Sequence, residues 1–183
     1  MKKLVKYVLI DILRNKIMIA YTVLLLVLSF STFNLEDNIT KGIMSLLNLV
    51  LLIVPLVSIL FSATYIYNSV EFLELMASQP LRRKTIWLSI FTGISLSLCL
   101  AFLVGIGIPV VLYAPGDTGI LLIAMGCILS VSFVAIALLA TVKVRDKAKG
   151  IGIAVLLWFY FAVLFDGILL FLLFQFADYP IEK

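Results

Sequence analysis

The sequence predicts an all-α fold, a polytopic bundle of transmembrane helices, and two observations carry this prediction. Of the 183 residues, 64% are hydrophobic, whereas soluble domains use about 45–50% apolar residues. The hydrophobic residues also fall into five long stretches separated by short polar connections. A helix needs about 20 apolar residues to cross the roughly 30 Å hydrocarbon core of a bilayer, and the five stretches meet or approach that length. They are Ile17–Phe33, Ile43–Ile66, Trp87–Tyr113, Ile120–Val142 and Ile151–Phe176.

The basic residues predict the orientation of the bundle. All but two of the 14 lysines and arginines lie before the first span, between the second and third, or between the fourth and fifth. The two exceptions are Lys41 and Lys183. Because cytoplasmic loops carry the excess of basic residues, the N-terminus is predicted to lie in the cytoplasm. The net charge of +4 is therefore a topological signal, and it does not indicate nucleic-acid binding.

Residues 1–16 predict an amphipathic helix in the cytoplasmic membrane interface. Its polar side would carry Lys3, Lys6, Asp11 and Arg14. Its apolar side would carry Val5, Val8, Leu9, Ile12 and Leu13. Such a helix places its apolar face in the membrane and its lysines near anionic headgroups. The alternative is a basic N-terminal segment without regular structure.

The second span carries polar side chains near one face, including Asn48, Ser58 and Ser62. One explanation is hydrogen bonding between neighbouring helices, at about 0.6 kcal/mol for each bond in a bilayer. The other explanation is a polar path through the bundle. Both interpretations fit the sequence.

The connection between the second and third spans, residues 67–84, predicts a short amphipathic helix on the cytoplasmic side. Its apolar residues, which recur at intervals of three and four, are Val70, Leu73 and Ala77. Glu71 and Glu74 form an acidic strip beside them, one turn apart, and need either solvent or a basic partner. Pro80 ends this helix because its ring disfavours a helical residue before it and removes a backbone donor. The basic residues that would anchor the next span at the headgroups are Arg82, Arg83 and Lys84.

The third span holds small residues and a proline at four-residue intervals, which predicts close packing against another helix. These residues are Gly93, Ser97, Ala101, Gly105 and Pro109. We expect Pro109 to kink the outer end of the span. The following connection, residues 114–119, contains a proline-glycine turn signal.

The fifth span contains an acidic residue, Asp166, in its outer half. An ionised aspartate at a helix centre costs about 2.5–3.5 kcal/mol, so Asp166 must face protein or water, or be protonated. A role in transport or assembly and a packing role at a subunit contact fit equally well.

Several kinds of chemistry are excluded. The absence of histidine removes histidine-based zinc sites and the Ser-His-Asp and Cys-His triads. The P-loop pattern GxxxxGK[ST] is missing, and Cys99 and Cys127 lie inside spans as packing residues. The methionines are too scattered to predict a copper site. We therefore predict no catalytic residue, no metal site and no cofactor in the chain.

The order of these features resembles that of the ABC-2 type permeases, the membrane subunits of ABC exporters. The resemblance rests on a basic interfacial helix, two spans, and then the sequence VEFLELMASQPLRRK from Val70 to Lys84. In that family the matching segment is a coupling helix that rests on a separate ATPase subunit. By position, the residues of this contact would be Glu71, Glu74, Pro80, Leu81, Arg82 and Arg83.

The resemblance implies a single permease domain over residues 1–183, embedded in the bacterial inner membrane and without enzymatic activity of its own. It implies an ATPase partner that holds ATP and Mg²⁺, a second permease copy, and a partner protein on the outer side. The compact size and the span with Asp166 resemble permeases linked to copper-site maturation of nitrous oxide reductase. The family has six spans with both ends inside, so we expect a longer protein with a sixth span after Lys183.

The leading functional hypothesis is a permease subunit that exports a substrate, or transmits mechanical work, using ATP hydrolysed by its partner. One alternative is an ABC-2 exporter of a lipid, a peptide or a drug. Another is a non-transporting membrane scaffold or assembly protein. An intramembrane enzyme is disfavoured because histidine is absent and Asp166 has no partner carboxylate in the spans.

Overall fold

The computed structural model consists of helices joined by short turns in the residues that it describes, which are 2–36, 38–78, 82–144, 146–164, 167–168, 171–172 and 175. In chain order the helices are α1 (Lys2–Leu13), α2 (Lys16–Leu35), α3 (Ile39–Asn68), α4 (Val70–Ala77), α5 (Arg83–Phe102), η1 (Leu103–Gly107), α6 (Ile108–Tyr113), α7 (Asp117–Lys143), α8 (Lys147–Phe159) and η2 (Tyr160–Leu164). The π-helical segments η1 and η2 continue α5 and α8 without a break. No strand occurs among the described residues, and the predicted all-α fold is confirmed.

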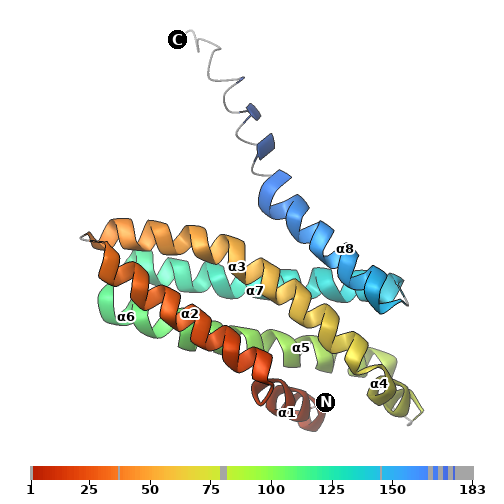
Figure 1. Ribbon diagram of the computed structural model, residues 1–183. Coiled ribbons are helices and arrows are strands. Elements are labelled where there is room, and N and C mark those ends of the chain that lie inside the picture. The colour runs from red at the N-terminus through yellow and green to blue at the C-terminus, as the bar shows by residue number, and fades with distance from the viewer. Residues whose placement is uncertain are drawn as a thin grey trace, which may run out of the picture.

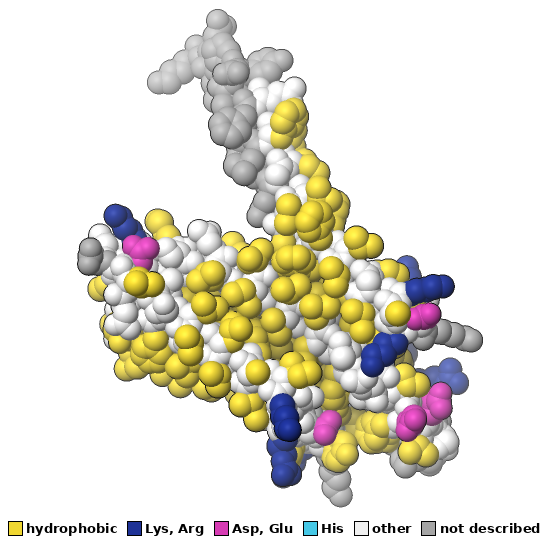
Figure 2. Space-filling view, viewed as in Figure 1, with side chains coloured by type: hydrophobic (Ala, Val, Ile, Leu, Met, Phe, Trp, Pro, Cys, Tyr) yellow, Lys and Arg dark blue, Asp and Glu magenta, His cyan; other side chains and the backbone are white. Residues whose placement is uncertain are grey.

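Among the described residues, five helical segments are long and apolar enough to cross a membrane, as predicted. They are Lys16–Leu35, Ile39–Asn68, Arg83–Tyr113, Asp117–Lys143 and Lys147–Leu164. The first four contain the predicted spans in full. The predicted fifth span continues to Phe176, and most of its residues after Leu164 lie outside the described part of the chain. Figure 2 shows a broad belt of hydrophobic side chains, with charged side chains gathered toward the ends of the bundle.

Three of the helices begin at a polar side chain that caps free backbone N–H groups. Asn15 accepts a hydrogen bond from the backbone of Ile17 at 3.0 Å, and Asn38 accepts one from Thr40 at 3.2 Å. Asp146 caps α8 by accepting from Ala148 at 2.8 Å. These caps satisfy donors that have no partner inside the helix, so they fix where α2, α3 and α8 start.

The small residues of the third span pack against two different helices. A Cβ added at Gly93 would lie 2.6 Å from Val8 Cγ1 of α1, and one added at Gly105 would lie 2.6 Å from Leu25 Cβ of α2. Such close approach is possible only because these positions lack a side chain. The α5–η1–α6 span is accordingly the most buried of the five.

The distortion that we expected from Pro109 takes the form of a π-helical turn. Proline has no backbone N–H, so the carbonyl of Gly105 loses its usual helical donor. Immediately before the proline, the backbone N–H of Ile108 donates to the carbonyl of Leu103, five residues back rather than four, and the helix is wider over η1.

The N-terminal helix α1 lies against α5, and part of its apolar side is covered by protein. Val8 and Ile12 are completely or almost completely buried in the main core. Lys6, Asp11 and Arg14, on the charged side predicted from the sequence, are exposed.

Helix α8 leaves the bundle. Figure 1 shows it starting beside the end of α7 and running away from α3 and α7 at a wide angle. Its buried residues are Gly150 and Ala154, and Ala154 packs with Ala63 of α3 and Ala137 of α7 in a second small core. Three alanines at one crossing allow the three helices to approach closely.

Candidate functional site

Helix α4 projects from the end of the second span and is the predicted coupling helix. The sequence suggested a segment from residue 67 to residue 84, but α3 continues through Asn68 and α4 occupies only Val70–Ala77. Ser69 separates the two helices, and its backbone N–H donates to Tyr65 at 3.0 Å. Residues 79–81 lie outside the described part of the chain, and with them Pro80 and Leu81.

The two sides of α4 differ in chemistry and in exposure. Leu73 and Met76 are partly buried and pack against the main core. Glu71 and Glu74 are exposed on the opposite side, next to Leu75, which is 68% exposed. We call Glu71, Glu74 and Leu75 the acidic face of α4. This face presents two carboxylates and one large apolar side chain without covering protein.

Helix α4, which packs on α5 and α3, also contacts the N-terminal helix. The ring of Phe72 stacks on the ring of Tyr7 in α1, with centroids 5.6 Å apart and planes 21° from parallel. Next to this contact, the hydroxyl of Tyr65 in α3 donates to the carboxylate of Asp11 in α1 at 3.1 Å. Because α1 packs extensively on α5, α4 is braced against the bundle through α1.

The basic cluster lies where the chain returns to the membrane. Arg82 occupies the N-cap position of α5 with an extended backbone, and Arg83 is the first helical residue. Arg82, Arg83 and Lys84 are all exposed. The end of the bundle that is predicted to be cytoplasmic therefore offers acidic side chains on α4 and basic side chains at the start of α5.

The polar residues predicted within the membrane do not form one group. Ser58 and Ser62 are fully buried, and the Ser62 hydroxyl donates to the backbone carbonyl of Ser58 at 2.6 Å within the same helix. Asn48 is exposed and lines a cavity of about 440 Å³ between α3, α7 and η2. Ten residues of helix separate Asn48 from Ser58, about 15 Å along the axis. Asp166 lies outside the described residues.

Comparison of the sequence with those of known proteins assigns the chain to a family. The chain is 32% identical over 184 aligned residues to a probable ABC transporter permease protein NosY from Stutzerimonas stutzeri, covering 89% of this chain and 67% of that protein. The chain belongs to the NosY family of ABC transporter permeases. A second NosY from Pseudomonas aeruginosa is 31% identical over 145 residues, covering 73% of this chain and 53% of that protein. No family model matches the chain.

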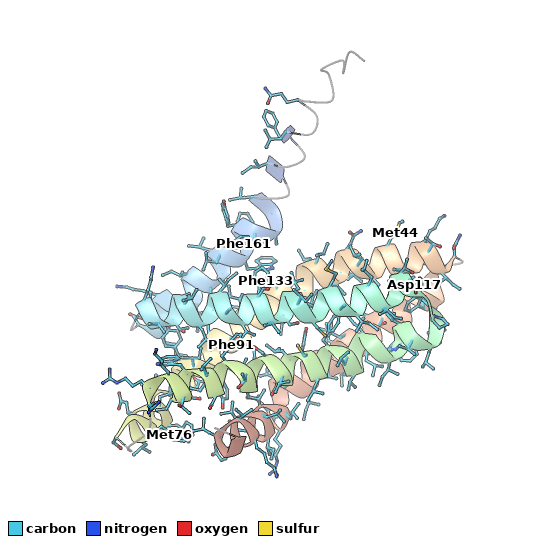
Figure 3. All side chains as sticks on the ribbon, turned by 180° about the vertical axis from the view of Figure 1, so that it is seen from behind. Met44, Met76, Phe91, Asp117, Phe133 and Phe161 are labelled. Atoms are coloured by element: carbon cyan, nitrogen blue, oxygen red, sulfur yellow. The ribbon has the colours of Figure 1, made fainter. Side chains whose placement is uncertain are left out.

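In the described part of this NosY-family chain, no three histidine, cysteine, aspartate or glutamate side chains lie close enough together to hold a metal ion. Figure 3 places Met44 and Met76 at opposite ends of the bundle. Cys99 and Cys127 are free thiols on neighbouring helices, and the Cys99 thiol lies 3.7 Å from the backbone carbonyl of Cys127. The thiols thus contribute to the contact between α5 and α7.

The NosY-family bundle has a polar contact at membrane depth that the sequence did not predict. Pro55 lies inside α3 and removes a helical hydrogen bond one turn before it. In the same region the indole N–H of Trp158 in α8 donates to the carbonyl of Leu52 at 3.1 Å. This bond ties α8 to α3 beyond the alanine crossing.

Replacing Trp158 by phenylalanine is expected to lower the free energy of unfolding by about 0.6 kcal/mol more than the same change at Trp87, because both changes remove part of the indole and only the first also removes a hydrogen bond. Equilibrium unfolding in mixed detergent micelles measures this change. Trp87→Phe, at an exposed tryptophan of α5, is the matched control. Equal losses in the two variants would show that the Trp158 hydrogen bond contributes nothing.

Sequence reasoning missed the residues that connect α4 to its surroundings. Tyr7 and Tyr65 hold α4 and the end of α3 to α1, and Tyr67 and Asn68 reach the start of α8. The available signal was the polar and aromatic sequence TYIYN at the end of the second span. Tyr65 falls within the predicted span and Tyr67 begins the predicted connection, and tyrosine is typical of a membrane interface.

Proposed function

We propose that this chain is the membrane permease subunit of a NosY-type ABC transporter and that a separate ATPase subunit docks on the acidic face of α4. The observation that carries this proposal is the exposure of Glu71, Glu74 and Leu75 on a helix whose other side is anchored to the bundle. Two exposed carboxylates beside an exposed leucine suit a partner groove that is apolar inside and basic at its rim. The partner would hold ATP and Mg²⁺, while the permease supplies no catalytic group.

The anchoring of α4 suits a mechanical role. A short helix that is stacked on α1 and hydrogen-bonded to the end of α3 transmits a displacement to the helices that it joins. Closure of two ATPase subunits around ATP would therefore displace whole helices, in the manner of rigid-body domain motions. Two ATPase subunits require two permease copies, so we propose a homodimer in the bacterial inner membrane.

By analogy with the NosY proteins, we further propose a NosF-like ATPase, a NosD-like protein on the outer side, and a role in copper-site maturation of nitrous oxide reductase. An exporter of a lipid, a peptide or a drug would use the same α4 contact. The outer partner, rather than α4, distinguishes these transport functions.

Co-expression with the ATPase subunit tests the central claim. We expect the ATPase to co-purify with the affinity-tagged permease from detergent-solubilised membranes, and its rate of ATP hydrolysis to change when the permease is removed. An ATPase that remains in the wash would contradict the proposal. An ATPase that binds but whose hydrolysis never responds to the permease would favour a non-transporting scaffold.

A further inference from the structure

The end of α3 makes a set of contacts with the base of α8. The hydroxyl of Tyr67 donates to the backbone carbonyl of Val144, which caps the end of α7, at 2.8 Å. The Nζ of Lys147 donates to the side-chain oxygen of Asn68, also at 2.8 Å. The ring of Tyr67 fills the place where residue 150 would carry a side chain, with its Cε2 2.6 Å from an ideal Cβ at Gly150. We call Tyr67, Asn68, Val144, Lys147 and Gly150 the α3–α8 latch.

The latch is the first of several attachments that hold α8 along α3 and α7; further along, Leu157 and Trp158 pack on the second small core, and Phe161 of η2 meets the ring of Phe133 edge to face. Gly150 and Ala154 are the buried residues of α8, and Trp158 adds one hydrogen bond further along. The exposed side chains in the second half of α8 and at the start of η2 include Leu156, Phe159 and Tyr160. The latch lies at the base of α8, where the helix starts to run away from α3 and α7 (Figure 1), so a shift there changes the direction of the whole helix.

The latch is also close to α4 in sequence and in space. One residue, Ser69, separates Asn68 from the start of α4. Backbone hydrogen bonds run across this junction, because Ser69 donates to Tyr65 at 3.0 Å and Leu73 donates to Ser69 at 2.9 Å. A rotation of α4 is thereby passed directly to the Tyr67 and Asn68 side chains.

We propose that Tyr67 and Asn68 are positioning residues that couple α4 to α8, so that a displacement of α4 re-aims α8 relative to α3 and α7. This inference rests on the proposed function, because the ATPase is the source of the displacement. The Tyr67 ring seated on Gly150 is the rigid part of the coupling, since the helix backbone meets the aromatic ring there without an intervening side chain. The two hydrogen bonds set the rotation of the ring and of the helix base.

The fit between Tyr67 and Gly150 can be tested without the ATPase. Gly150→Ala should lower the unfolding temperature of the wild-type permease by roughly 3–10 °C, because the added methyl group meets the ring. In a Tyr67→Ala background the same change should be neutral or stabilising, since alanine is the better helix former. An equal loss in both backgrounds would overturn the inference.

The coupling itself is tested in the complex with the ATPase. Spin labels on the exposed Leu139 of α7 and Leu156 of α8, after replacement of Cys99 and Cys127, report the distance between the two helices. We expect ATP to shift this distance in the wild-type complex, to shift it less with Tyr67→Phe, and to leave it unchanged with Tyr67→Ala while the ATPase still co-purifies.

A full shift with Tyr67→Ala, or no shift in a wild-type complex that binds the ATPase, would overturn the inference. Failure of the ATPase to bind the wild-type permease would instead contradict the proposed function, and the Gly150 comparison would still decide whether the latch exists.

Discussion

Replacing Glu71 and Glu74 together by lysine is expected to weaken binding of the ATPase subunit at least about a hundredfold, which is roughly 2.7 kcal/mol. Both carboxylates are exposed on the acidic face of α4, and a basic partner surface would meet like charges after the change. The new lysines lie on the side predicted to be cytoplasmic, so the orientation of the spans should be unaffected. Binding of purified ATPase to permease in lipid nanodiscs measures the effect.

The matched series separates charge from shape. Glu71→Gln with Glu74→Gln should weaken binding by about tenfold and should make it less sensitive to salt, because the screened charge pairs are gone. Asp117→Asn removes an exposed acid at the end of the bundle opposite α4, as Figure 3 shows, and should leave binding unchanged. Undiminished binding of the double lysine variant would mean that the acidic face is not the docking surface.

Much of the fold is predictable from hydropathy, since each of the first four spans needs only enough apolar length to cross the bilayer. The amphipathic pattern around Glu71 and Glu74 likewise predicts a helix beside the membrane, because a period of three to four with acids on one side fits few other structures. The capping residues Asn15, Asn38 and Asp146 lie just before the first, second and fifth predicted spans, where the helices begin. Local chemistry alone determines these features.

Contacts between distant segments account for what the sequence did not predict. The direction of α8 depends on the seating of Tyr67 on Gly150, which joins positions 83 residues apart along the chain. A glycine in a span predicts close approach, but it does not say which helix approaches. Gly93 and Gly105 illustrate this, because they belong to one ridge of α5 and η1 and yet contact α1 and α2 respectively. The acidic face was therefore predictable, whereas its connection to α8 was not.

Replacing Gly126 of α7 by leucine is expected to disrupt the packing of α5 against α7 and to give the largest loss of stability of any change considered. The ring of Phe102 is fully buried and lies over Gly126, with Cε1 only 2.6 Å from an ideal Cβ at that position. A rigid aromatic ring at the centre of the bundle cannot turn aside as a lysine or methionine would, so the helices must separate. The loss should exceed the roughly 1–3 kcal/mol of ordinary overpacking, and thermal unfolding in detergent measures it.

Gly152→Leu is the matched control, because nothing lies within 4 Å of a Cβ at Gly152. Adding Phe102→Ala to Gly126→Leu should recover part of the stability, and a double variant no more stable than Gly126→Leu alone would show that the ring is not the cause.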